Sequence, residues 1–179
     1  MEQFWREGFE ASSVQKLLDA TEINRGTLYN SFGDKETFFK KCLDRYNDEL
    51  QSAIDETLGN ADIKPKEAVI AWFDKLVISA PPKQRQLGCL LVNSVCESIN
   101  WNKDIQKYLR ASLSKLRKAL LVRTKELDKA KKLNKGIKPE LAADILLSAY
   151  NGLQVDARNG KAPKQMREVL DVNISAVCK

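Results

Sequence analysis

The side chains best suited to bind a partner lie in one polar stretch near the N-terminus, residues 24–35. Leu28 and Phe32 stand four positions apart, which places both on the inner face of a short helix. That helix turns outward a set of residues that can bond to phosphates or base edges: Arg25, Gly26, Thr27, Tyr29 and Asn30. Gly26 removes a side chain where the backbone could approach a nucleic acid closely. The stretch predicts a nucleic-acid contact surface, and a tight helix pair with solvated charges remains the alternative interpretation.

Three short helical segments are expected to hold this surface in place. Gly8 can end the first segment, Ser12 can cap the second, and Asn24 can cap the third. Asp34 can cap the long helix that follows, and Lys35 lies at its amino end, where free amides and the helix dipole favour a phosphate. Two short helices joined by a tight turn and braced by neighbours predict a helix-turn-helix, whose second helix enters the major groove of DNA.

Cysteine offers a second kind of chemistry at Cys89. This residue follows Gly88 at an expected helix start, where amide dipoles stabilise a nucleophilic thiolate. Cys89 is therefore a candidate redox or electrophile sensor, with a buried, inert thiol as the alternative. The four cysteines form no Cys-x-x-Cys pair, which argues against a zinc knuckle or a thioredoxin-type motif.

The absence of histidine is the most restrictive single observation. Histidine is the commonest general base and metal ligand, and the sequence contains none. The sequence also lacks the glycine-rich loops that bind nucleotides. We therefore predict no catalytic residues, no metal site and no cofactor, and we expect a protein that is not an enzyme.

Composition predicts a folded, all-α chain. The 179 residues are 43% hydrophobic and 30% charged, with only eight glycines and five prolines. No apolar run is long enough to span a bilayer, and the first ten residues lack the pattern of a signal peptide, so we expect a cytoplasmic protein without membrane contact. Between the glycine and proline residues, apolar residues recur at helical spacing, whereas no segment alternates as a strand does.

Charge is distributed unevenly along the chain. The net charge is +6, yet residues 1–46 hold seven basic and eight acidic side chains. Residues 103–138 hold thirteen basic and three acidic side chains. We interpret this basic segment as the solvated outer face of a long helix, with a nucleic-acid patch as the alternative.

The N-terminal residues closely resemble the TetR (tetracycline repressor-like) family of bacterial regulators. Two stretches carry the resemblance: Phe4-Trp5-Arg6-Glu7-Gly8-Phe9 through Val14, and Ile23-Asn24-Arg25-Gly26-Thr27-Leu28-Tyr29 through Glu36. The similarity covers roughly residues 1–46 and implies a helix-turn-helix DNA-binding domain there. Residues 47–179 are then expected to form a helical domain for effector binding and dimerisation.

The resemblance implies a homodimer that binds a near-palindromic double-stranded DNA operator and releases it when a small molecule binds. The family's DNA-facing positions fall on eight residues: Ser12, Ser13, Arg25, Gly26, Thr27, Tyr29, Asn30 and Lys35. In one respect the chain departs from the family, because only three residues precede Phe4. We therefore expect a first helix that lacks most of its first turns, so that either Met1 is internal to a longer chain or DNA binding is weak.

The C-terminal helices are expected to supply the effector pocket and the dimer interface. The predicted pocket is lined by bulky residues of the central helices: Trp72, Phe73, Leu76, Leu91, Val95, Trp101 and Tyr150. The predicted interface uses the apolar faces of the last two helices: Leu146, Tyr150, Leu153, Met166, Val169, Leu170 and Val177. The alternative interpretations are an ordinary core in both cases.

A weaker resemblance connects Gly88–Asn93 and Gly152–Arg158 to a branch of the family with a Gly-Cys turn before its sixth helix. Some members with that turn respond to electrophiles or oxidants, which supports the hypothesis for Cys89. Two further readings stay open: a helical dimeric adaptor without operator binding, and an enzyme with an unrecognised site. The sequence leaves open the operator, the effector and the choice between repression and activation.

Overall fold

A computed structural model describes residues 1–179 and shows an all-α chain, which confirms the predicted fold class. Its elements in chain order are α1 Glu2–Ala11, α2 Val14–Thr21, α3 Arg25–Phe32, α4 Lys35–Glu56, α5 Pro65–Phe73, the π-helical turn η1 Asp74–Ile78, α6 Pro82–Arg85, α7 Leu90–Glu97, the 3-10 turn η2 Ser98–Asn100, α8 Lys103–Lys129, α9 Pro139–Arg158 and α10 Pro163–Val177. One isolated bridge between Leu133 and Cys178 is the only extended pairing.

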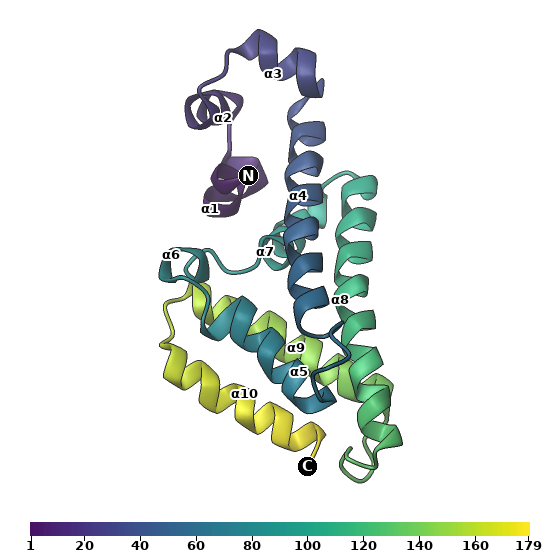
Figure 1. Ribbon diagram of the computed structural model, residues 1–179. Coiled ribbons are helices and arrows are strands. Elements are labelled where there is room, and N and C mark those ends of the chain that lie inside the picture. The colour runs from purple at the N-terminus through teal and green to yellow at the C-terminus, as the bar shows by residue number, and fades with distance from the viewer.

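The helices form two groups connected by α4 (Figure 1). Helices α1, α2 and α3 gather at one end of the molecule, and α4 runs from there into the group formed by α5, α8, α9 and α10. The C-terminus lies at the end opposite α3. Because α4 spans Lys35–Glu56, it crosses the predicted boundary between residues 46 and 47 and belongs to both groups.

Local capping determines where the first helices begin. The Asn24 side chain accepts a hydrogen bond from the Thr27 amide at 2.8 Å, and Asp34 accepts one from the Thr37 amide at 2.6 Å. Both predicted caps are therefore confirmed. The predicted Ser12 cap is wrong, because the N-cap is Ser13, whose side chain accepts a hydrogen bond from the Lys16 amide in the first turn of α2 at 3.3 Å.

Gly8 bends α1 where the sequence predicted its end. Gly8 has φ 83° and ψ 174°, a conformation that only glycine adopts readily, and one more helical turn follows it to Ala11. The Ser12 hydroxyl donates to the Gly8 carbonyl at 2.6 Å, which satisfies a group that the bend removes from the helical pattern. The bend therefore explains why Ser12 points inward and cannot cap α2.

One continuous hydrophobic core joins the two helix groups. It contains 39 buried residues, from Phe4 in α1 to Cys178 after α10. Phe4 packs edge-on against Phe39 of α4 with ring centroids 4.9 Å apart, and Trp101 packs against the same ring at 5.7 Å. The short N-terminal helices thus gain most of their stability from tertiary packing rather than from their own length.

Candidate nucleic-acid interface

The α2–α3 pair forms a helix-turn-helix at one end of the molecule (Figure 1). Helix α2 ends at Thr21, and Glu22 takes the left-handed conformation with φ 55° that closes a helix tightly. Leu28 is fully buried on the inner face of α3, and Phe32 packs against Phe38 with ring centroids 4.5 Å apart. These contacts fix which face of α3 points to solvent.

The outward face of α3 carries the residues that the sequence predicted. The side chains of Arg25, Thr27, Tyr29 and Asn30 and the backbone of Gly26 are exposed, and Tyr29 is 41% exposed despite its size. The five residues are all exposed within the first six positions of α3, and the N-terminal part of a recognition helix is the part that contacts base edges.

Arg25 differs from the other basic residues of the N-terminal region because it has no intramolecular partner. Arg6, Lys16, Lys40, Lys41 and Arg45 each form an ion pair with a nearby carboxylate. No ion pair and no hydrogen bond holds the Arg25 guanidinium, so it is free to meet an external anion or a guanine edge. The exposed ion pairs are weak and can exchange for phosphates at small cost.

Two of the predicted DNA-facing residues lie differently from the expectation. Ser12 is fully buried and its hydroxyl bonds to backbone carbonyls of α1, so it presents no group to solvent. The Lys35 ammonium donates to the Glu10 carbonyl at 3.4 Å and lies 4.5 Å from the centre of the Phe9 ring. Partial burial lowers the pKa of Lys35. Ser13 is exposed, and its predicted DNA-facing role stays a prediction.

Helix α1 connects this surface to the C-terminal helices through contacts that the sequence did not reveal. The Trp5 indole N–H donates to the Gly88 carbonyl at 3.1 Å in a buried hydrogen bond. Glu97 at the end of α7 accepts from the Phe9 amide at 3.2 Å. The Arg158 guanidinium at the end of α9 donates to the carbonyls of Trp5, Arg6 and Leu87 at 3.3–3.5 Å. The only sequence signal for this connection was the weak resemblance around Gly88 and Arg158.

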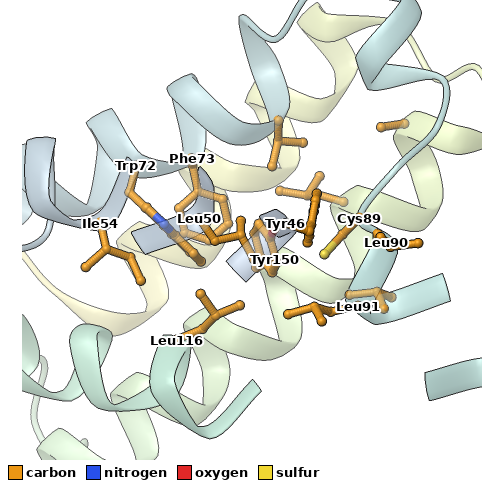
Figure 2. Close-up of a cluster of buried hydrophobic side chains, with 14 of the residues drawn as sticks. Tyr46, Leu50, Ile54, Trp72, Phe73, Cys89, Leu90, Leu91, Leu116 and Tyr150 are labelled. Carbon is orange, nitrogen blue, oxygen red and sulfur yellow. The ribbon is translucent and has the colours of Figure 1, made fainter. Parts of the chain in front are cut away.

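The predicted effector pocket is mostly solid core. Trp72, Phe73, Leu91 and Tyr150 are fully buried and pack tightly, with the Trp72 and Tyr150 rings 4.6 Å apart (Figure 2). Of the other predicted residues, Trp101 belongs to the aromatic contact with α1, and Val95 is exposed on the surface. The seven residues therefore do not surround one cavity, because large aromatic side chains fill the space between the central helices.

A cleft of about 170 Å³ lies beside that core, between α1, α4, η1 and α9. Only Leu76 and Tyr150 of the predicted pocket residues line it. Its other walls include Trp5, Tyr46 and Gln154, which the sequence did not indicate. The cleft thus adjoins both the C-terminal core and the first helix of the N-terminal group.

Cys89 is the N-cap residue of α7, in agreement with the helix start predicted after Gly88, and its side chain is fully buried. Figure 2 shows the sulfur pointing toward the aromatic side chains of Tyr46 and Tyr150. Cys42 and Cys178 are also buried, whereas Cys96 is exposed. An electrophile could reach Cys89 only if this cluster opened, and the sensor role stays a prediction.

The predicted dimer interface is largely internal. Six of its seven residues are buried within the chain: Leu146, Tyr150, Leu153, Met166, Leu170 and Val177. Val169 alone is exposed. Other apolar residues of α9 and α10 face solvent instead, namely Leu141, Val155 and Val172. The helices are apolar on more than one face, as predicted. However, the face that was predicted to contact a second subunit packs into the core of the same chain.

The basic segment lies mainly on α8, whose lysines face solvent along the helix. Arg123 is the exception, because its buried guanidinium donates to the carbonyls of Leu58 and Asn60 and pairs with Glu126. This arginine thus fixes the loop after α4. No helix of the chain is long and apolar enough to cross a bilayer, and no cluster of three metal-ligating side chains occurs.

Comparisons with known proteins connect the geometry to a family. Residues 1–42 match the family described as bacterial regulatory proteins, tetR family. The chain is 26% identical over 174 residues to the HTH-type transcriptional repressor ComR of Escherichia coli strain K12, an alignment that covers 94% of this chain and 80% of that protein.

Two solved structures share the fold along nearly the whole chain. The regulatory protein TetR from Rhodobacter sphaeroides superposes with a TM-score of 0.89 at 16% identity, over 98% of this chain and 93% of that one. A cysteine mutant of the TetR family transcriptional regulator CifR, solved with 26-base-pair double-strand operator DNA, superposes with a TM-score of 0.84 at 21% identity, over 97% and 91% of the two chains.

Proposed function

We infer that this chain, which belongs to the TetR family of bacterial regulatory proteins, is a DNA-binding transcriptional repressor that acts as a homodimer on a near-palindromic operator. The observation that carries the proposal is the exposed polar face of α3, on which Arg25 has no partner within the chain. We assign DNA binding to residues 1–46, and effector binding and dimerisation to residues 47–179. A small molecule bound in the second part releases the DNA.

In this proposal α3 lies in the major groove, where some of its side chains contact base edges and others contact the DNA phosphates. Arg25 at the first turn of α3 pairs with a guanine edge through its two parallel N–H groups. Thr27, Tyr29 and Asn30 bond to phosphates or to neighbouring bases, and Gly26 lets the helix backbone approach the groove wall. Lys35 reaches a phosphate by giving up its bond to the Glu10 carbonyl, which is long and costs little to break.

The N-terminal region carries slightly more acidic than basic side chains, so its net charge does not attract DNA. Attraction to DNA must come from individual basic side chains that lie close to phosphates. Five of its bases are already paired with acids at the surface. A phosphate that replaces a carboxylate partner keeps the base paired, but it releases fewer counterions than a free base would. We therefore expect a salt dependence that reflects only a few phosphate contacts in each half-site.

Dimerisation uses the apolar surface that α9 and α10 turn to solvent. Along α9 this surface contains Leu141, Ser148, Gly152 and Val155, which follow one another at helical spacings of seven, four and three residues, and α10 contributes Val169 and Val172. Small residues let two helices approach closely, and four such helices from two chains can pack as a bundle. A two-fold dimer of this kind presents two copies of α3, as a near-palindromic operator requires.

The test measures binding to DNA from upstream of the chain's own gene by fluorescence anisotropy at two salt concentrations. We expect selective binding that weakens as salt increases. Arg25→Ala should cost about 1 to 3 kcal/mol and relax the sequence preference at one position of each half-site. Arg110→Ala is the matched control, since Arg110 is an exposed arginine on α8, away from α3, and its loss should leave selectivity unchanged.

The contrary outcome is equally clear. If the chain forms dimers but shows no selectivity for upstream DNA or for a library of random duplexes, the repressor proposal is wrong and the dimeric adaptor reading replaces it. If Arg25→Ala and Tyr29→Ala both bind as the parent does, α3 is not the recognition helix.

A further inference from the structure

The cleft beside α1 contains a polar group that the protein itself leaves without a partner. Tyr150 is fully buried where it lines the cleft, and its hydroxyl makes no hydrogen bond of normal geometry, although the Cys89 thiol and the Gln154 side chain lie close to it. A buried hydroxyl without a partner is costly, and native structures rarely keep one without a reason. Burial raises the pKa of Tyr150 well above 10, so the group stays a neutral donor at physiological pH.

A second polar group lies one helical turn away on α9. Gln154 is buried, and its side-chain amide N–H donates to the Leu76 carbonyl at 3.2 Å. Its amide oxygen accepts no hydrogen bond from the chain and remains available to a donor. The cleft therefore offers a ligand one unused donor, from Tyr150, and one unused acceptor, from Gln154.

The remaining walls define the ligand's size and charge. Trp5 and Tyr46 add two aromatic side chains to that of Tyr150, with ring centroids of Trp5 and Tyr46 5.0 Å apart. The volume of about 170 Å³ suits a molecule built on one six-membered ring, since cavities of about 150 Å³ hold benzene. The only ionised side chains that line the cleft are Glu49 and Lys75, and both are exposed to solvent. The inner walls therefore carry no charge that would stabilise a charged ligand.

The same cleft contacts the helix that holds the DNA-binding group. Trp5 lines the cleft, and its indole N–H donates to the carbonyl of Gly88, which lines it as well. A ligand that fills the space against Trp5 competes with this contact. Because Trp5 belongs to α1, its displacement shifts the helix against which α4 and the aromatic cluster around Phe4 are packed.

We propose that this cleft is the effector site, that its ligand is a small uncharged aromatic compound with one carbonyl-type oxygen, and that occupancy is transmitted to the DNA-binding helices through Trp5. The ligand oxygen accepts the Tyr150 hydroxyl, and the ring stacks among the three aromatic walls. The transmission step rests on the proposed function, whereas binding in the cleft does not.

The test uses calorimetry on the full chain without DNA and four probes that differ in one property each. Acetophenone and benzamide are neutral rings with an acceptor oxygen, ethylbenzene lacks the acceptor, and benzoate carries a charge. We expect acetophenone and benzamide to bind more tightly than ethylbenzene, and benzoate to bind least. Tyr150→Phe should weaken acetophenone about fivefold, the value of one neutral hydrogen bond, and leave ethylbenzene unchanged.

Tyr150→Phe should fold normally, because it removes only a hydroxyl that has no partner. Tyr108→Phe is the matched control: Tyr108 lies outside the cleft, and its loss should leave affinity for every probe unchanged. A second readout is the operator complex, which acetophenone should dissociate in the parent chain. In Trp5→Phe, which lacks the indole N–H, acetophenone should still bind but dissociate the DNA complex less.

Each failure points to a different step. If acetophenone and benzamide show no saturable binding at millimolar concentration, or bind equally to Tyr150→Phe, the ligand class is wrong. If they bind the parent as expected but leave its operator complex intact, the role of Trp5 is wrong. If the unliganded chain binds no operator, the proposed function fails, and the calorimetric result still decides the cleft.

Discussion

Replacing Gly8 by alanine should destabilise the chain by about 2.5 kcal/mol, because two separate penalties meet at this residue. Gly8 has φ 83° and ψ 174°, a region that a residue with a Cβ atom occupies at a cost of about 1 to 3 kcal/mol. An added Cβ would also overlap the carboxylate of Glu97. That carboxylate accepts a hydrogen bond from the Phe9 amide and must move away.

The magnitude follows from adding these terms. We take about 2 kcal/mol for the backbone and about 1 kcal/mol for the Glu97 bond, which is partly exposed. The reduced freedom of the unfolded chain offsets about 0.5 kcal/mol of this sum. Gly136→Ala is the matched control, because Gly136 has φ 85° but open space around its Cβ position. Its cost should be about 0.5 to 1.5 kcal/mol, since only the positive φ opposes the alanine and the unfolded chain offsets part of that strain.

Urea unfolding monitored by tryptophan fluorescence gives both free energies from the shift in midpoint at constant slope. A double-mutant cycle with Glu97→Ala separates the two penalties: in that background Gly8→Ala should cost about 1 kcal/mol less, because the overlapping carboxylate is absent. A Gly8→Ala cost no larger than that of Gly136→Ala would refute the assigned role of the bend. A cycle without coupling would refute the contact with Glu97.

Three further changes test other parts of the structure. The pKa of Tyr108 is raised to about 12 by burial and by its bond to Asp44, so the stability it adds is full below pH 10 and is lost as pH increases to 12. Tyr108→Phe should remove that loss and cost about 1 kcal/mol at neutral pH, as urea titrations at each pH would show. Val172→Glu, at a 69% exposed position on α10, should convert dimers to monomers in analytical ultracentrifugation, whereas Val122→Glu, 55% exposed on α8, should not. Lys35→Ala should flatten the slope of log K against log salt by about 0.9, because it removes one cation that neutralises a phosphate.

The N-terminal helices could be predicted because their determinants are local. Asn24 and Asp34 cap the helices that follow them within three residues, and Leu28 is buried because it shares a face with Phe32. The sequence could not distinguish Ser12 from Ser13 as the cap of α2, because both residue types can cap a helix. The bend at Gly8 decides between them, since it turns Ser12 inward. A distant or conformational determinant of this kind leaves no periodic signal in the sequence.

The C-terminal region was harder because periodicity identifies apolar faces without saying which partner each face meets. Leu146 and Leu153 pack inside the chain, whereas Leu141 and Val155 on the same helix point to solvent. The pocket prediction was wrong for a related reason. Large aromatic residues such as Trp72 mark where volume is filled, whereas a cleft forms where side chains leave space, and that depends on how several segments pack together.

Through Phe4 and Trp5, the short helix α1 contacts both helix groups. Phe4 packs against Phe39 and stabilises the helix-turn-helix, whereas its neighbour Trp5 points the other way and bonds to Gly88 in the C-terminal group. From the end of α9, Arg158 donates to the carbonyls of Trp5 and of the next residue, Arg6. Because adjacent residues of one helix contact the two groups, a rotation of α1 that releases Trp5 must also disturb Phe4. In the proposed transmission, these two side chains therefore connect the cleft to the DNA-binding surface through α1 and its contacts with α4.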